Sequence, residues 1–266
     1  MRPGALLLSF SVSVLGTLFY VPQTSFAATG KSIKPGVTRV VRASDANPSE
    51  RRLVALLDAV TALSRRDDIA YVWGGRTTSS PVVCTACKRC IEKRKVNPYR
   101  RVAQCPACEQ CGVDCSGFVS RVMRAAGLGS TRITSQSLIR QTKKRDLSFK
   151  PVGRNLSLAR TGDLIVLPDH VVIFLDRHEN RKLDYVHASR FIPGRPAGGI
   201  EVVASGDLPR GQKPVTILRP NAFEGAGNSA AVRHRIKAML GHTLRKKKIK
   251  PVLPVIPDNV RLARAH

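Results

Sequence analysis

One cysteine occupies a position where its sulfur could act as a nucleophile. Cys115 lies in the segment Asp114-Cys115-Ser116-Gly117-Phe118, directly before a stretch with helical periodicity. The start of a helix carries partial positive charge, which favours a thiolate and lowers the pKa of a thiol placed there. Backbone N–H groups of the same helix turn can also stabilise an oxyanion. Cys115 is therefore a candidate nucleophile for acyl transfer.

Two histidines are candidates for the base that such a nucleophile needs. His170 directly precedes the apolar run 171–175, and His187 lies within the run 183–188. A meander of antiparallel strands can bring both histidines to one edge of a sheet. His170 would then serve as the general base, and His187 would orient its ring and fix its tautomer. Spacing alone does not establish these contacts.

The remaining six cysteines form two groups of three before Cys115. Each group has the spacing Cys-x-x-Cys-x-x-Cys, and the members are Cys84, Cys87, Cys90, Cys105, Cys108 and Cys111. Paired Cys-x-x-Cys groups at this separation are typical of structural zinc sites with four thiolate ligands. An oxidising compartment favours three disulfides instead, and an iron–sulfur cluster is a third alternative. The sequence leaves both the metal and the pairing of these cysteines undecided.

Helices are predicted on both sides of this cysteine-rich block. Asn47 caps a helix that ends near residues 65–68, with Pro48 in its first turn and leucines at helical spacing. A second helix runs from Cys115 to Ala126 and is closed by Gly127. A short helix is expected over residues 135–142, within a basic segment of mixed character.

Short apolar runs bounded by glycine, proline or charge replace the helical periodicity after Gly162. They predict strands over residues 164–167, 171–175, 183–188, 199–204 and 215–218, arranged as an antiparallel meander. Helices that precede a run of strands indicate an α+β domain.

The N-terminus has the pattern of a secretory signal. Arg2 is followed by an uncharged apolar run over residues 5–20 and then by the small residues Ser25, Ala27 and Ala28. The run is shorter than a membrane span needs, which favours cleavage over an uncleaved anchor. We therefore expect an exported protein of the periplasm, the cell envelope or the external medium.

The chain is strongly basic, with a net charge of +27 from 45 Lys and Arg against 18 Asp and Glu. In an exported protein this charge indicates either anionic envelope surfaces as partners or a solvated surface in a generally basic proteome, and the sequence does not choose between them. Nucleic acid is not expected, because no aromatic residues interleave with the basic ones as in a base-stacking surface.

These observations divide the chain into four segments. Residues 1–28 are the signal peptide and residues 29–46 a polar linker. Residues 47–219 form the main domain, which contains the cysteine-rich insert 77–113. Residues 220–266 are interpreted as a basic, loosely ordered extension, with helical character over 232–244 and three prolines that exclude a helix after residue 250.

Five motifs in order resemble those of the NlpC-type cell-wall peptidases, a papain-like family. They are Tyr71-Val72-Trp73-Gly74-Gly75, Asp114 to Phe118, Gly162-Asp163-Leu164, His170 to Ile173 and Val186 to Ser189. The resemblance covers roughly residues 47–219. It departs from the family in the long segment 76–113, where the family normally has a shorter loop.

The resemblance implies a papain-like α+β fold, with the nucleophile helix packed on an antiparallel sheet of about five strands. It implies Cys115 as nucleophile, His170 as base and His187 as the residue that orients the base. Tyr71, Asp114 and Ser116 match positions that line the nucleophile's pocket or lie near the free amine of the substrate. All six assignments are carried over by motif alone.

The implied activity is that of a cysteine-type endopeptidase acting on peptidoglycan or muropeptides. The family usually cuts stem peptides between D-glutamate and a diamino acid, through an acyl-enzyme and without a cofactor. The alternative is a non-catalytic basic protein that binds the cell envelope. The complete Cys-His-His set argues against that alternative, because a binding protein has no need for a reactive thiol.

Overall fold

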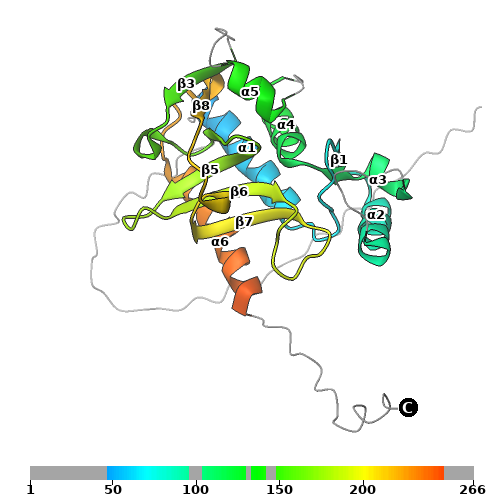
Figure 1. Ribbon diagram of the computed structural model, residues 1–266. Helices are drawn as coiled ribbons and strands as arrows, with labels where there is room; N and C mark the ends of the chain where they lie inside the picture. Colours follow the sequence, from blue (N-terminus) through cyan, green and yellow to red (C-terminus); the bar gives the residue numbers. More distant parts are fainter. Residues whose placement is uncertain (1–46, 96–103, 130–132, 142–147, 249–266) are drawn as a thin grey trace, which may run out of the picture. The chain divides into compact units, whose positions relative to one another are not determined.

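The computed structural model describes residues 47–95, 104–129, 133–141 and 148–248 (Figure 1). The predicted signal peptide, the linker and the end of the chain after residue 248 lie outside these residues. Within the described part, no helix is both long and apolar enough to cross a membrane.

The first helix, α1 (Pro48–Ser64), forms as its sequence predicts. The side chain of Asn47 accepts a hydrogen bond from the backbone N–H of Glu50 at 2.8 Å, and Pro48 occupies the first turn. The buried side chains Leu53, Leu56, Leu57 and Val60 recur at helical spacing and face the core. Capping and periodicity together therefore account for this helix.

The nucleophile helix, α4 (Cys115–Ala125), also begins and ends where it was predicted. Asp114 caps its start, and Gly127 follows its end with φ 72°, a left-handed conformation that glycine adopts without strain. A short helix, α5 (Ser135–Gln141), confirms the expectation for that segment. The nucleophile candidate is thus the first residue of a helix, as expected.

The six-stranded antiparallel sheet has the order β3-β8-β4-β5-β6-β7. Its members are β3 (Phe149–Gly153), β4 (Leu164–Val166), β5 (Val171–Arg177), β6 (Leu183–Ser189), β7 (Gly199–Gly206) and β8 (Thr216–Pro220). The strands β4 to β7 form the predicted meander. The α+β class is therefore confirmed.

Two features of the sheet differ from the prediction. The strand β8 does not continue the meander but crosses back to pair with β4. The strand β3 was not predicted, because it is short and contains Pro151, which cannot donate to a ladder. It lies at the edge of the sheet and pairs only with β8, a position where a proline is tolerated.

The two faces of the sheet bury alternate residues of the same strands. Leu164 and Val166 of β4 join α1 and α4 in the main core, whereas Ile165 belongs to a smaller cluster on the other face. Leu208 and Leu156 cover that smaller cluster from loops. The helices α1 and α4 therefore pack on one face of the sheet (Figure 1).

The last described helix, α6 (Ala230–Lys248), corrects the predicted domain boundary at residue 219. Val232, Ile236 and Met239 are buried in the main core, and α6 contacts α1 and β7. These side chains bury apolar surface that a loose extension would leave in water. The domain therefore includes this helix.

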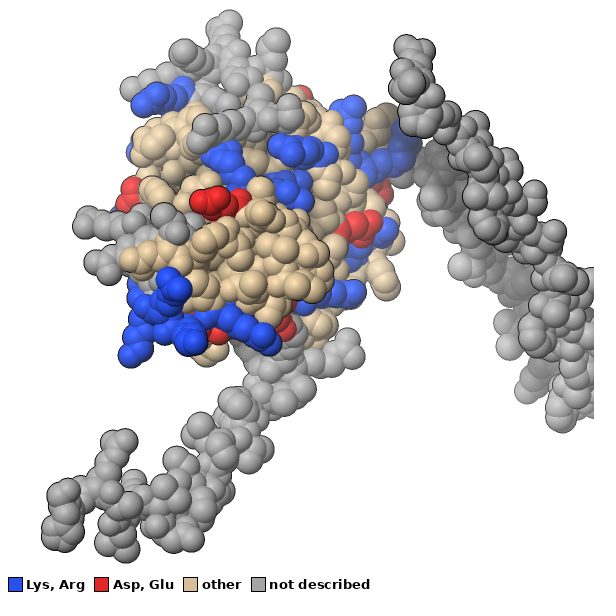
Figure 2. Space-filling view, turned by 90° about the vertical axis from the view of Figure 1, so that its right-hand side faces the viewer, with Lys and Arg blue, Asp and Glu red and all other residues tan. Residues whose placement is uncertain are grey.

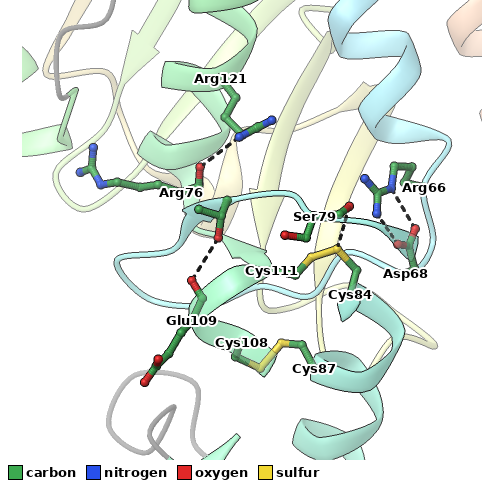
Figure 3. Close-up of a disulfide and its surroundings, with 11 residues drawn as sticks. Arg66, Asp68, Arg76, Ser79, Cys84, Cys87, Cys108, Glu109, Cys111 and Arg121 are labelled. Atoms are coloured by element: carbon green, nitrogen blue, oxygen red, sulfur yellow. Dashed lines mark hydrogen bonds and ion pairs between the residues drawn. A yellow bond between two sulfur atoms is a disulfide. The ribbon is translucent and has the colours of Figure 1, made fainter. Parts of the chain in front are cut away.

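The cysteine-rich insert consists of α2 (Pro81–Arg94) and α3 (Ala107–Gln110), flanked by the paired strands β1 (Arg76–Thr77) and β2 (Gly112–Val113). Three disulfides join α2 to the segment 105–111, which contains α3; they are Cys84–Cys111, Cys87–Cys108 and Cys90–Cys105. Figure 3 shows the first two of these disulfides, one after the other between the helices. In this arrangement each of the six sulfurs is bonded to another sulfur.

The spacing of the cysteines allows nested disulfides but does not select them. Cys84, Cys87 and Cys90 recur every three residues and so lie along one side of α2. Their partners run in the opposite direction along the chain, which gives an antiparallel ladder. The hydroxyl of Thr77 donates to the carbonyl oxygen of Glu109, and Arg121 of α4 donates to the carbonyl oxygen of Arg76 (Figure 3). Hydrogen bonds thus connect the insert, through β1, to the helix α4.

Candidate active site

The start of α4 is held against the Tyr-x-Trp-Gly-Gly segment by backbone contacts. The N–H of Asp114 donates to the carbonyl oxygen of Gly75 at 3.0 Å. A Cβ at Gly117 would lie 2.0 Å from that same oxygen, so only glycine permits this approach. Two of the sequence motifs therefore meet directly, and their contact places Cys115 next to the Trp73-Gly74-Gly75 turn.

Asp114 organises the first turn of α4. One carboxylate oxygen accepts from the N–H of Gly117 at 2.6 Å and from the hydroxyl of Ser116 at 2.9 Å. The other accepts from the N–H of Gly74 at 2.9 Å. The side chains of Asp114 and Ser116 are both buried, and neither lines the cavity described below. The structure thus places these two predicted substrate contacts inside the helix cap.

The Cys115 thiol is buried between α4 and the start of β5. The backbone N–H groups of Val171, Ser116 and Cys115 favour the thiolate and act to lower its pKa. Burial acts in the opposite direction and is larger, and the charge of Asp114 adds to it, so the pKa of Cys115 is raised to about 12. The backbone groups at the helix start act to lower this pKa, as expected, but burial outweighs them.

His170 lies at the end of a tight turn. The turn joins β4 to β5, and the N–H of Leu167 donates to the carbonyl oxygen of His170 at 2.8 Å. The next residue, Val171, is the one whose N–H faces the Cys115 sulfur. Burial, with smaller contributions from His187 and Arg210, lowers the pKa of His170 to about 3. The resting pair is therefore a neutral thiol and a neutral imidazole.

His187 lies on β6 and contacts the far side of the His170 ring. The distance from Nε2 of His170 to Nδ1 of His187 is 2.7 Å, and the rings are nearly perpendicular. His187 is buried, and the ring of Tyr185 packs edge-on against it. His170 and His187, which come from two different sequence motifs, are thus in direct contact.

A carboxylate that the sequence analysis did not identify completes this row. Glu201 of β7 lies directly across from His187 in the strand register, and its Oε2 lies 3.6 Å from Nε2 of His187. Glu201 interrupts an otherwise apolar strand, and that charge was the only local signal for it. Its position opposite His187 depends on the register between β6 and β7, which the sequence alone does not predict.

The histidines border a cavity of about 570 Å³. Tyr71, predicted to line the nucleophile's pocket, is among its lining residues. The aromatic side chains of Trp73 and Phe191 also line it and are 57% and 63% exposed. Exposed aromatic rings beside buried polar groups are typical of a site that binds a ligand.

Arginines lie at the Phe191 end of the cavity. The guanidinium carbons of Arg190 and Arg210 both lie 5.5 Å from the centre of the Phe191 ring. Guanidinium groups bind carboxylates through paired hydrogen bonds. This end of the cavity therefore suits an anionic ligand.

In the described part of the chain, no group of three or more His, Cys, Asp or Glu side chains is arranged to hold a metal ion. The chemistry that the described residues support is nucleophilic attack by a thiol, assisted by an imidazole.

Comparison with known proteins identifies the central part of the chain. The model of the NlpC/P60 family matches residues 68–192, which include Cys115, His170 and His187. No curated protein and no solved structure gives a significant match. The match confirms the resemblance drawn from the five motifs, and the six-stranded sheet with its helices agrees with the papain-like α+β fold.

Proposed function

We propose that the protein is an exported cysteine peptidase of peptidoglycan, and the match of residues 68–192 to the NlpC/P60 family supports this proposal. The bond we propose is an amide of the stem peptide, between D-glutamate and a diamino acid. One observation carries the proposal. The Cys115 sulfur faces the peptide that follows His170, and His170 is hydrogen-bonded to His187.

The proposed reaction begins with neutral groups. As the Cys115 sulfur attacks the carbonyl carbon of the amide, its proton passes to Nδ1 of His170. The carbonyl oxygen becomes an oxyanion, and the N–H groups of Cys115 and Ser116, which face the sulfur at rest, are the nearest donors for it. His170 then gives the proton to the leaving amine as the C–N bond breaks, and a thioester remains on Cys115.

Hydrolysis of the thioester restores the enzyme. His170, now neutral again, takes a proton from a water molecule that attacks the thioester carbonyl. The C–S bond breaks, the proton returns to sulfur, and the new carboxylate leaves. The cycle consumes one amide and one water and needs no cofactor.

The cavity supports a peptide substrate with carboxylate groups. Trp73 and Phe191 present exposed rings for apolar or sugar contacts. The arginines at the Phe191 end suit the carboxylates of an acidic stem peptide.

The disulfides of the insert support export. Three disulfides form and persist in oxidising compartments and are rare in the cytosol. The signal-like N-terminus supports the same location.

Mass spectrometry of digested muropeptides tests the proposal. We expect the protein to convert a disaccharide tetrapeptide into two fragments cut at the D-glutamyl bond, and Cys115→Ala to release none. The variant should retain the melting temperature of the parent protein to within a few degrees, because Ala fits the first turn of a helix. Equal cleavage by the variant would exclude Cys115 as the nucleophile.

A further inference from the structure

The proposed mechanism needs one particular tautomer of His170. Its Nδ1 must carry a lone pair to accept the thiol proton, so the ring hydrogen must be on Nε2. That hydrogen must then be donated to Nδ1 of His187, 2.7 Å away. His187 must in turn carry its own hydrogen on Nε2.

The hydrogen bond between the histidines does not choose this direction by itself. In the opposite arrangement, Nδ1–H of His187 donates to Nε2 of His170, and the hydrogen of His170 then lies on Nδ1. A His170 in that state cannot accept a proton from Cys115. The choice therefore depends on what lies at Nε2 of His187.

Glu201 is the polar group at that position. Nε2 of His187 is buried and has no hydrogen-bond partner in the described structure, and Oε2 of Glu201 lies 3.6 Å from it. The other polar neighbour, Tyr185, uses its hydroxyl to donate to the carbonyl oxygen of Asp207. A carboxylate attracts an N–H and repels a lone pair, so it favours the hydrogen on Nε2.

We propose that Glu201 is a positioning residue that sets the tautomers of His187 and His170. The row then runs from Glu201 through His187 and His170 to Cys115, with each hydrogen directed away from the sulfur. When His170 accepts the thiol proton, its positive charge is relayed through His187 towards the carboxylate. This inference rests on the proposed function for its effect on the reaction rate, but not for its effect on the tautomers.

The substitution Glu201→Gln tests the proposal, because an amide presents either an oxygen or an NH2 group to His187 and so no longer selects one tautomer. We expect kcat for muropeptide cleavage to fall about 100-fold, the lower end of what a positioned base contributes. Glu201→Asp keeps a carboxylate and should restore part of the rate. Glu224→Gln removes an exposed carboxylate that pairs with Lys150, and it should leave kcat unchanged.

Nitrogen-15 NMR of the histidine rings provides a readout that needs no substrate. In the parent protein at pH 7 we expect His170 and His187 both protonated on Nε2, and in Glu201→Gln a mixture with Nδ1. The charged and titratable groups around the pair are Cys115, Tyr185, Glu201 and Arg210. Spectra of Cys115→Ala test whether the thiol itself affects the tautomers. They should show the tautomers of the parent protein.

The outcomes separate the two ideas. A parent protein that cleaves no muropeptide would contradict the proposed function, while its NMR spectra would still support or overturn the role of Glu201. A Glu201→Gln variant with parental tautomers would overturn that role, whatever its kcat. Loss of kcat in Glu201→Gln, together with a shift of His170 to Nδ1–H, would support it.

Discussion

At the scale of single residues, the site differs from the expected thiolate–imidazolium pair. Burial raises the pKa of Cys115 to about 12 and lowers that of His170 to about 3. The N–H groups at the start of α4 make the rise in the pKa of Cys115 smaller but do not reverse it. Proton transfer from sulfur to imidazole therefore becomes part of the attack on the substrate, and the resting thiol is weakly reactive.

Alkylation of Cys115 by iodoacetamide checks this protonation state. Because only the thiolate reacts, we expect the rate to rise about tenfold per pH unit between pH 7 and 9. The other cysteines are in disulfides, so Cys115→Ala should take up no label. A rate that stays constant from pH 5 to 8 would instead indicate a preformed ion pair.

At the scale of elements, the disulfides of the insert have different neighbours. Cys84 and Cys111 belong to the main core, whereas Cys87, Cys105 and Cys108 form a separate cluster with Ile91. The outermost disulfide therefore connects the insert to the core, close to β2 and the nucleophile. The innermost one, Cys90–Cys105, only closes the insert on itself.

Paired substitutions distinguish these roles. We expect Cys84→Ala with Cys111→Ala to lower the free energy of unfolding by about 2–4 kcal/mol, as loss of a native disulfide does, and to lower kcat as well. Cys90→Ala with Cys105→Ala should leave kcat nearly unchanged.

The zinc alternative for the same cysteines has its own test. For the parent protein we expect six oxidised cysteines by mass spectrometry and a melting temperature that EDTA does not change. One bound zinc per chain, lost together with stability in EDTA, would contradict the disulfide pairing.

The helix α6 provides a second test at this scale, since it lies beyond the expected domain end at residue 219. Ile236 is buried in the main core, so Ile236→Ala should lower the free energy of unfolding by about 2–5 kcal/mol. The neighbouring Lys237 is exposed, and Lys237→Ala is the matched control with little effect. Urea unfolding of both variants measures the difference, and equal stability would restore the shorter domain.

At the scale of the whole molecule, the chain is strongly basic, with a net charge of +27. Figure 2 shows Lys and Arg side chains in several groups on one face, with Asp and Glu at only a few places. On α2, Arg89 and Lys93 are exposed one helical turn apart. Such a surface attracts anionic polymers over about 10 Å at moderate salt.

Salt dependence separates this attraction from catalysis. We expect binding of Cys115→Ala to purified cell walls to weaken steeply between about 0.05 and 0.5 M NaCl, because salt screens exposed charges. Turnover of a small soluble muropeptide by the parent protein should change much less. Binding that is independent of salt would show that the basic surface does not hold the protein to the wall.

The sequence by itself determined the features that depend on neighbouring residues. The cap at Asn47, the helical spacing of the leucines in α1 and the short apolar runs of the meander are local patterns, and each produced its element. Asp114, predicted as a substrate contact, instead caps α4. The motifs also predicted Cys115, His170 and His187 as site residues, and the fold brings the two histidines into direct contact.

Only the tertiary structure decided what depends on residues distant in the chain. Strand β8 crosses back because its partner is β4, and α6 packs because the core leaves space for Ile236. The partners of the six cysteines and the position of Glu201 opposite His187 depend on the way separate elements meet. The raised pKa of Cys115 has the same origin, since burial is a property of the assembled fold and no local pattern encodes it.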